Sequence, residues 1–257
     1  MPESVTLEGR EDQHGTATRP SGRDRYFLAM AVLMIVLNVV GFAPSYFLKS
    51  FFDGPELPPY MHIHGAMFMS WFVLFFIQMW MIESRNVALH KKLGIAGAVL
   101  ACGMVLSALT VLYFLVMEYH EFGGDLAVRA AVVWGNLALL TGFTTFVTLG
   151  FVFRSRPAAH KRLMLLASLS MMPQALGRMG RFEALRLNDS FFVNEAVYGL
   201  GGLVLLLVSL VIHDIVVRGR PHPAVMWGAP LFFGSIVVIG LVVPNTEFGQ
   251  ALILMFG

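Results

Sequence analysis

Histidines are the residues of this sequence whose type and spacing best support chemistry, because imidazole is the commonest metal ligand and titrates near neutral pH. His90 and His160 begin two similar motifs, His-Lys-Lys-Leu and His-Lys-Arg-Leu, and each motif follows a short basic turn. This similarity predicts that residues 62–117 and 127–178 form repeated helical hairpins, related by an axis along the membrane normal. The two histidines would then lie at equivalent depths and face each other.

Two chemistries fit these histidines. In the first, imidazoles from two helices ligate the iron of a b-type haem, with His90 and His160 as the first choice and His213 as the alternative ligand. In the second, a zinc ion keeps one position open for a water molecule. The predicted zinc ligands are His90, His160, His222 and Asp214. The sequence identifies no catalytic residue beyond these sets.

The composition restricts where this chemistry takes place. Of the 257 residues, 57% are apolar and 13% are charged, whereas soluble domains have about 45–50% apolar and about 25% charged residues. These values indicate a multi-pass membrane protein and exclude a disordered chain or an ordinary soluble enzyme. A net charge of +2 argues against a nucleic-acid partner. The single Cys102 excludes an intramolecular disulfide framework and a CxxCH haem attachment.

Seven stretches are apolar enough to cross the hydrocarbon core, which takes about 20 residues. The predicted fold is therefore an all-α polytopic bundle, with residues 1–25 as a disordered cytoplasmic tail and residues 26–257 as one transmembrane domain. The fifth stretch is the shortest and contains Pro173. The seven predicted spans are 26–47, 62–82, 93–117, 127–153, 163–178, 193–217 and 227–243.

Lysine and arginine set the orientation, because positively charged loops stay on the cytoplasmic side. With the N-terminus inside and the C-terminus outside, 13 of the 18 basic residues fall on the inner side. Arg178, Arg181 and Arg186 fall on the outer side, after the fifth stretch. Guanidinium groups bind carboxylates and phosphates, so these arginines suggest an anionic partner at the outer face.

This orientation sorts the histidines into two layers. The inner layer holds His90, His160, His213 and His222. The outer layer holds His62, His64 and His120, with His120 in a loop. On the second stretch, helical spacing places His64, Trp71 and Gln78 on one side. We expect that side to face the bundle interior and His62 to lie at the interface, because polar groups in hydrocarbon need partners.

Simpler structural roles compete with these interpretations. A histidine beside lysine or arginine at a helix end also serves as a contact to lipid headgroups. Asn38, Gln78 and Asn136 also serve as interhelical hydrogen-bonding groups. The 16 methionines fit a packed core as well as they fit copper binding.

As a set, the motifs resemble an uncharacterised family of bacterial multi-histidine, multi-pass membrane proteins. The resemblance covers roughly residues 60–230 and implies the inner cell membrane but no particular reaction. The motifs are His62-Ile-His64-Gly with Trp71 and Gln78, His90-Lys-Lys-Leu-Gly94, Arg156…His160-Lys-Arg-Leu-Met164, and Asp214…Arg218-Gly-Arg220-Pro-His222-Pro223…Trp227-Gly228.

The His-basic-basic-Leu motif is also distantly similar to helix starts of cytochrome b561-type diheme membrane proteins. In those proteins, histidines of paired helices ligate b-type haem near each face. The similarity implies an inner haem with Arg156 or Arg162 near its propionates. An outer haem on His64 would have Arg178 and Arg181 in that role. The sequence departs from the pattern at the outer face, which has no mirrored pair of helical histidines.

Three functions therefore stay open. The first is a membrane redox protein with haem b or another metal. The second is a transporter or an accessory or assembly subunit without catalysis, and the third is an intramembrane zinc-dependent hydrolase. The expected partners are the lipid bilayer and either a redox partner or another subunit of a membrane complex. Retinal binding is not expected, because the seventh stretch contains no lysine.

Overall fold

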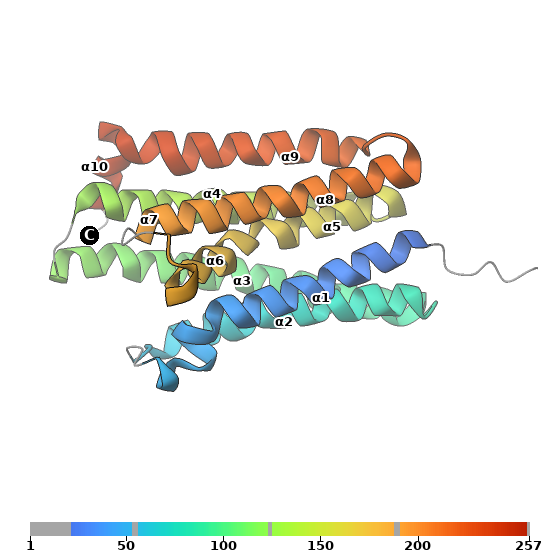
Figure 1. The fold of residues 1–257 in the computed structure, drawn as a ribbon, viewed down its shortest axis with the longest axis horizontal. Helices are drawn as coiled ribbons and strands as arrows, with labels where there is room; N and C mark the ends of the chain where they lie inside the picture. The colour runs from blue at the N-terminus through green and yellow to red at the C-terminus, as the bar shows by residue number, and fades with distance from the viewer. Residues whose placement is uncertain (1–21, 53–55, 123–124, 188–190, 256–257) are drawn as a thin grey trace, which may run out of the picture.

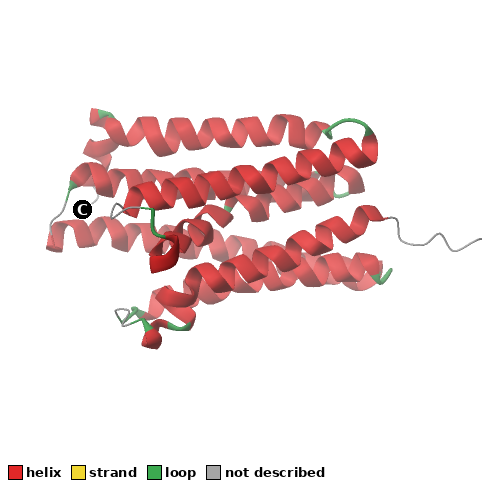
Figure 2. Cartoon of the chain, in the orientation of Figure 1, coloured by secondary structure: helices red, strands yellow, loops and turns green. Residues whose placement is uncertain are grey.

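The computed structural model describes residues 22–52, 56–122, 125–187 and 191–255. These residues are helical almost throughout, and no strand occurs among them (Figures 1 and 2). The long helices lie side by side, with the connecting turns gathered at the two ends of the bundle (Figure 1). The predicted all-α class is confirmed.

Six helical stretches in the described part of the chain are long and apolar enough to span a membrane. Many of their side chains face outward, such as Leu205 and Val216, which are 72% and 78% exposed. Outward-facing apolar side chains are expected where a helix contacts lipid. The helices that form these stretches are α1 (Gly22–Phe42) with η1 (Ala43–Phe47), α2 (Pro59–Glu83), α3 (Val87–Phe122), α4 (Leu126–Val152), α8 (Gly201–Arg218) with the end of η5 (Glu195–Leu200), and α9 (Pro223–Ser235) with η6 (Ile236–Val242) and η7 (Val243–Asn245).

The fifth predicted span, residues 163–178, does not form a helix of that kind. It falls on α5 (Pro157–Ser170) and α6 (Met172–Gly177), which are separated at Met171. Pro173, in the first turn of α6, has no backbone N–H and cannot continue the preceding helix. Almost every residue from 163 to 177 is buried. This stretch contacts protein and not lipid, which explains why it is shorter and more polar than the six spanning helices.

Several element ends also differ from the prediction. Helix α3 starts at Val87 and runs to Phe122, so His90 lies in its first turn and His120 lies in a helix, not in the predicted loop. Helix α8 is preceded by α7 (Phe191–Asn194) and η5 (Glu195–Leu200), and α9 continues through η6 (Ile236–Val242) and η7 (Val243–Asn245). An unpredicted short helix, α10 (Glu247–Met255), follows. It is held to α4 by Trp134, whose Nε1 donates to Gly249 O at 3.0 Å.

Small residues let neighbouring helices approach closely. A Cβ atom at Gly41 of α1 would lie 2.1 Å from Ala175 O of α6, and one at Gly142 of α4 would lie 2.3 Å from the Phe232 ring of α9. Glycine at these positions therefore sets the interhelical distance.

One end of the bundle collects the start of α1, the α2–α3 and α4–α5 turns and the α8–α9 loop (right in Figure 1). His90, His160, His213 and His222 belong to these segments, whereas His62 and His64 start α2 at the other end. The two histidine layers inferred from the sequence are therefore present in the fold.

Candidate functional site

His90 and His160 meet at the end of the bundle that holds the α2–α3 and α4–α5 turns. Their ring centroids are 6.2 Å apart and their planes are nearly perpendicular, at 86°. Each histidine is the fourth residue of its helix, and each backbone N–H is bonded four residues back, to Asn86 O and Arg156 O. The short basic turns thus place both histidines at the fourth residue of a helix, near one another at the same end of the bundle.

The His160 ring is held in one orientation by the backbone of α4. Its Nδ1 lies 2.8 Å from Gly150 O and, facing a carbonyl, acts as the donor. The lone pair of the ring is then on Nε2. Metal-ligating histidines commonly have this arrangement, in which one ring nitrogen donates to a carbonyl and the other is left for the ligand. Gly150 is packed tightly, since a Cβ there would lie 2.7 Å from the Met164 sulfur.

The His90 side of the pair contains polar atoms without partners. The Gln78 side chain lies beside His90, but the individual atoms His90 Nδ1 and Gln78 Oε1 are buried without a hydrogen-bond partner. One turn after His90, a Cβ at Gly94 would meet only Gln78 Nε2, at 4.0 Å. Unsatisfied buried polar atoms cost free energy, and they need an explanation such as a bound ligand. The chemistry available here is two imidazoles and one amide oxygen beside an open glycine.

Asp214 is engaged by an interaction that the sequence did not predict. Arg162 Nε donates to both carboxylate oxygens at 2.9 Å, and its Nη2 donates to Oδ1 as well. The His222 backbone N–H donates to Oδ2 at 2.8 Å. The two side chains are 3% and 0% exposed. The pair joins the start of α5 to the end of α8, and an acid near the end of one apolar helix with an arginine at the start of another was the only sequence signal for it.

His222 caps helix α9. Its Nδ1 accepts a hydrogen bond from Ala224 N at 3.0 Å, so this nitrogen is neutral and already occupied. Burial, together with the charges of Arg162 and Arg218, lowers the pKa of His222. These contacts give His222 a structural role at the α8–α9 loop.

The four predicted zinc ligands are not assembled into one site. Among the residues whose placement is described, no three His, Cys, Asp or Glu side chains come together so that they could hold a metal ion. His90 pairs with His160, while Asp214 is bonded to Arg162 and to the His222 backbone. Arg162, which was predicted to lie near haem propionates, instead forms the ion pair with Asp214.

His213, the alternative haem ligand, packs against α1. Its ring stacks on Tyr26 with centroids 4.1 Å apart, and it meets Phe27 edge-on. Both ring nitrogens are buried without a hydrogen-bond partner, and Nδ1 is 3.6 Å from Asp214 Oδ1. The Tyr26 hydroxyl is 2.9 Å from Ser209 Oγ. Stacking between α1 and α8 accounts for the position of this ring.

The polar stripe on α2 is arranged as predicted. Trp71 is buried and its Nε1 donates to Ser168 Oγ of α5 at 3.1 Å. His64 is half-buried, stacks on Phe68, and has Nδ1 3.4 Å from Ser107 Oγ of α3. His62 is exposed and lies near Tyr46.

At the end of the bundle opposite to His90 and His160, Arg178 is bonded to other residues of the bundle. Its Nη1 donates to Gln174 O at 2.6 Å and to Gln174 Oε1 at 3.2 Å. Gln174 Nε2 donates to Asn136 Oδ1 at 3.0 Å, and the guanidinium lies 4.6 Å from the centroid of the Phe42 ring. The side chains of Arg181 and His120 lie outside the described atoms. Of the residues predicted for an outer haem, His64 contacts Phe68 and Ser107, and Arg178 is bonded to Gln174.

No family model matches the sequence, and no match is found among curated proteins or solved structures. The function is therefore inferred from the geometry of the site.

Proposed function

We propose that this chain is an integral membrane redox protein that holds a b-type haem iron between His90 and His160. The separation of the two rings carries the proposal. Two imidazole nitrogens that each lie about 2 Å from one metal ion place their ring centroids about 6 Å apart. The observed centroid separation is 6.2 Å.

The surroundings of the pair support the same ligand. Gly150 O orients the His160 ring, and His90 Nδ1 is buried without a partner. Gly94 leaves room beside His90, since the only atom near a Cβ there is Gln78 Nε2. Exposed basic residues at this end, such as Lys91 and Arg156, are positioned to meet propionates. Haem supplies one-electron chemistry, and the protein tunes it through the axial ligands, burial and nearby charge.

For the membrane arrangement, we propose seven crossings with the N-terminus inside, in the inner cell membrane. The six apolar helices account for six crossings. The buried α5–α6 stretch supplies the remaining one through the interior of the bundle. The distribution of lysine and arginine supports this orientation.

Cofactor analysis of the purified full-length chain tests the proposal. We expect about one haem per chain in a pyridine haemochrome assay, with the haem lost in both His90→Ala and His160→Ala. His62→Ala serves as the matched control, because His62 is exposed at the other end of the bundle. A colourless protein with stoichiometric zinc would contradict haem binding and favour the hydrolase. A protein with neither haem nor metal would overturn the proposal and favour transport or assembly.

A further inference from the structure

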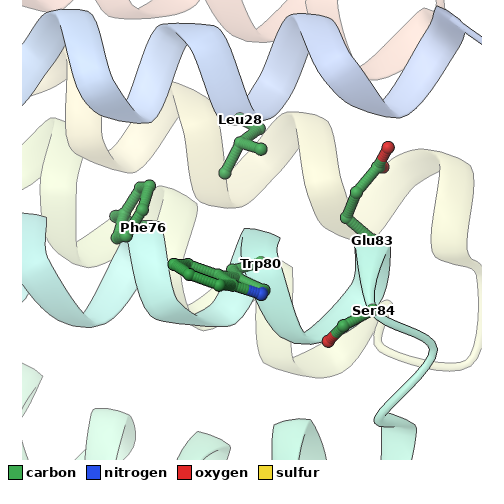
Figure 3. Close-up of a pocket in the computed structure, with 5 residues that line it drawn as sticks. All are labelled: Leu28, Phe76, Trp80, Glu83 and Ser84. Carbon is green, nitrogen blue, oxygen red and sulfur yellow. The ribbon is translucent and has the colours of Figure 1, made fainter.

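A groove runs along the outer surface between α1 and α2. Two adjoining hollows, with volumes of about 430 and 630 Å³, share Leu28 and Glu83 and so form one depression. Both volumes fall within the range of small-molecule sites, about 300–1,000 Å³. Figure 3 shows Glu83 reaching from α2 toward α1, above Trp80 and beside Leu28. The groove is lined by Arg25, Leu28, Ala29, Val32, Leu33 and Val36 of α1, and by Phe76, Trp80 and Glu83 of α2, with Ser84 at its end.

Opposite charges lie at one end of this α1–α2 groove. Arg25 Nε is 3.9 Å from Glu83 Oε1, and the Arg25 side chain is 78% exposed. The other carboxylate oxygen, Glu83 Oε2, is buried and has no hydrogen-bond partner. A carboxylate oxygen in that position needs an N–H or O–H donor, because leaving it unpaired costs free energy. The groove is thus lined by a carboxylate with one unsatisfied oxygen, beside an exposed cation.

The rest of the groove is apolar and has a defined length. From Arg25 to Val36 the α1 lining advances by 11 residues, which corresponds to about 16 Å along a helix. That length is about half of the hydrocarbon core, which is about 30 Å thick. Val32, Leu33 and Val36 are 45%, 40% and 50% exposed, so they are available for contact. One acyl chain of a single leaflet fits this dimension.

We propose that the α1–α2 groove binds a phospholipid whose headgroup carries a primary ammonium, of the phosphatidylethanolamine class. The ammonium pairs with the Glu83 carboxylate, the phosphate pairs with Arg25, and one acyl chain lies along α1. The exposed Trp80 ring contributes packing at the headgroup level and attraction for the cation. A choline headgroup has no N–H to donate, and a glycerol headgroup can donate only from neutral hydroxyl groups, without the positive charge that pairs with Glu83. The site therefore distinguishes these three lipid classes by their headgroups alone.

Competition between lipids with the same acyl chains tests this assignment. The full-length protein is placed in nanodiscs containing equal amounts of phosphatidylethanolamine, phosphatidylcholine and phosphatidylglycerol, and the lipids retained on release are measured by native mass spectrometry. We expect phosphatidylethanolamine to be retained about tenfold over phosphatidylcholine, the scale of one charge-assisted hydrogen bond. Lipids with mono- and dimethylated ethanolamine headgroups retain at least one N–H. Their preference over phosphatidylcholine should therefore persist, and only the quaternary choline headgroup should lose it.

Three variants separate the two headgroup contacts. Glu83→Gln should abolish the preference for ethanolamine over choline, whereas Arg25→Gln should weaken retention of all three lipids and keep that preference. Glu56→Gln is the control, because Glu56 is an exposed acid at the other end of α2, paired with Lys49 at 2.9 Å. Equal retention of the three lipids by the unmodified protein would overturn the proposal. So would an unchanged preference in Glu83→Gln.

Discussion

Arg162 and Asp214 form an ion pair that is almost completely buried inside the bundle, with side-chain exposures of 3% and 0%. Arg162 also donates from Nη1 to Ala158 O at 2.8 Å, and Asp214 accepts from the His222 backbone. His160 lies between Ala158 and Arg162 on the same turn of α5. The pair therefore fixes the helix start that carries His160, and it connects that start to α8 and to the α8–α9 loop.

Removing either member of this pair should destabilise the protein strongly. Asp214→Asn leaves the Arg162 charge buried without its counter-charge, and Arg162→Met does the reverse. The expected loss is about 3–5 kcal/mol, because an uncompensated buried charge is far more costly than the intact pair. Thermal unfolding in detergent measures it. The double variant Arg162→Met with Asp214→Leu should recover much of the lost stability. A double variant whose loss in unfolding free energy equals the sum of the losses of the two single variants would contradict this explanation.

Close packing at Gly41 makes a second prediction. Gly41→Ala places a Cβ against the Ala175 carbonyl of α6, which is backbone and cannot move aside cheaply. The two helices must separate, so we expect a loss of about 1–3 kcal/mol and a lower melting temperature. Gly201→Ala is the matched control, because nothing lies within 4 Å of a Cβ there. Alanine is the better helix former, so this control should be neutral or stabilising. Equal melting temperatures for the two variants would argue against the close contact.

The cap of α9 should make stability depend on pH. Burial and the charges of Arg162 and Arg218 lower the pKa of His222 below its usual value of 6.5. At a pH between the lowered pKa of His222 in the folded protein and its usual pKa of 6.5 in the unfolded chain, the unfolded chain binds more protons than the folded protein. The stabilisation is therefore complete above about pH 6.5 and is lost as the pH falls through the lowered pKa.

A non-titrating cap isolates this effect. His222→Asn can still accept from Ala224 N but carries no proton in this range. The melting temperature of the unmodified protein should fall relative to that of His222→Asn as the pH drops from about 7.5 to about 5.5, because only the histidine cap weakens. A difference that stays constant over this range would show that His222 does not titrate in the folded state.

Cysteine labelling tests the proposed seven crossings. In a Cys102→Ala background, Glu56→Cys and Glu183→Cys should react with a membrane-impermeant maleimide in intact cells. Arg154→Cys should react only after the cells are permeabilised. Glu183 follows the buried α5–α6 stretch, so its side of the membrane decides whether that stretch crosses. Labelling of Arg154→Cys and Glu183→Cys under the same condition would show that it does not.

The sequence predicted those features that follow from a local pattern. Six apolar stretches matched six spanning helices, and the polar spacing on α2 correctly predicted the burial of Trp71 and the outward position of His62. The similarity of the two basic turns predicted that His90 and His160 lie near each other, and their ring centroids are 6.2 Å apart. The repeat of the two hairpins stays a prediction.

Features that depend on contacts between distant segments were not predictable in the same way. Pro173 marks the break at Met171 in the sequence, but the burial of α5 and α6 arises from the helices packed around them, and no period in the sequence shows this. Asp214 was interpreted as a metal ligand, because only the folded chain brings Arg162 to it. The unpartnered oxygen of Glu83 is likewise visible only once α1 covers α2.

Electron paramagnetic resonance of the oxidised full-length protein tests the central proposal most directly. Two histidines on one haem iron should give a low-spin ferric signal, and the 86° angle between the His90 and His160 rings should give that signal strongly anisotropic g values. Both His90→Ala and His160→Ala should abolish the low-spin signal, and His62→Ala should leave it unchanged. The proposal is contradicted if the unmodified protein gives no haem signal, or if the low-spin signal persists in either alanine variant of the pair.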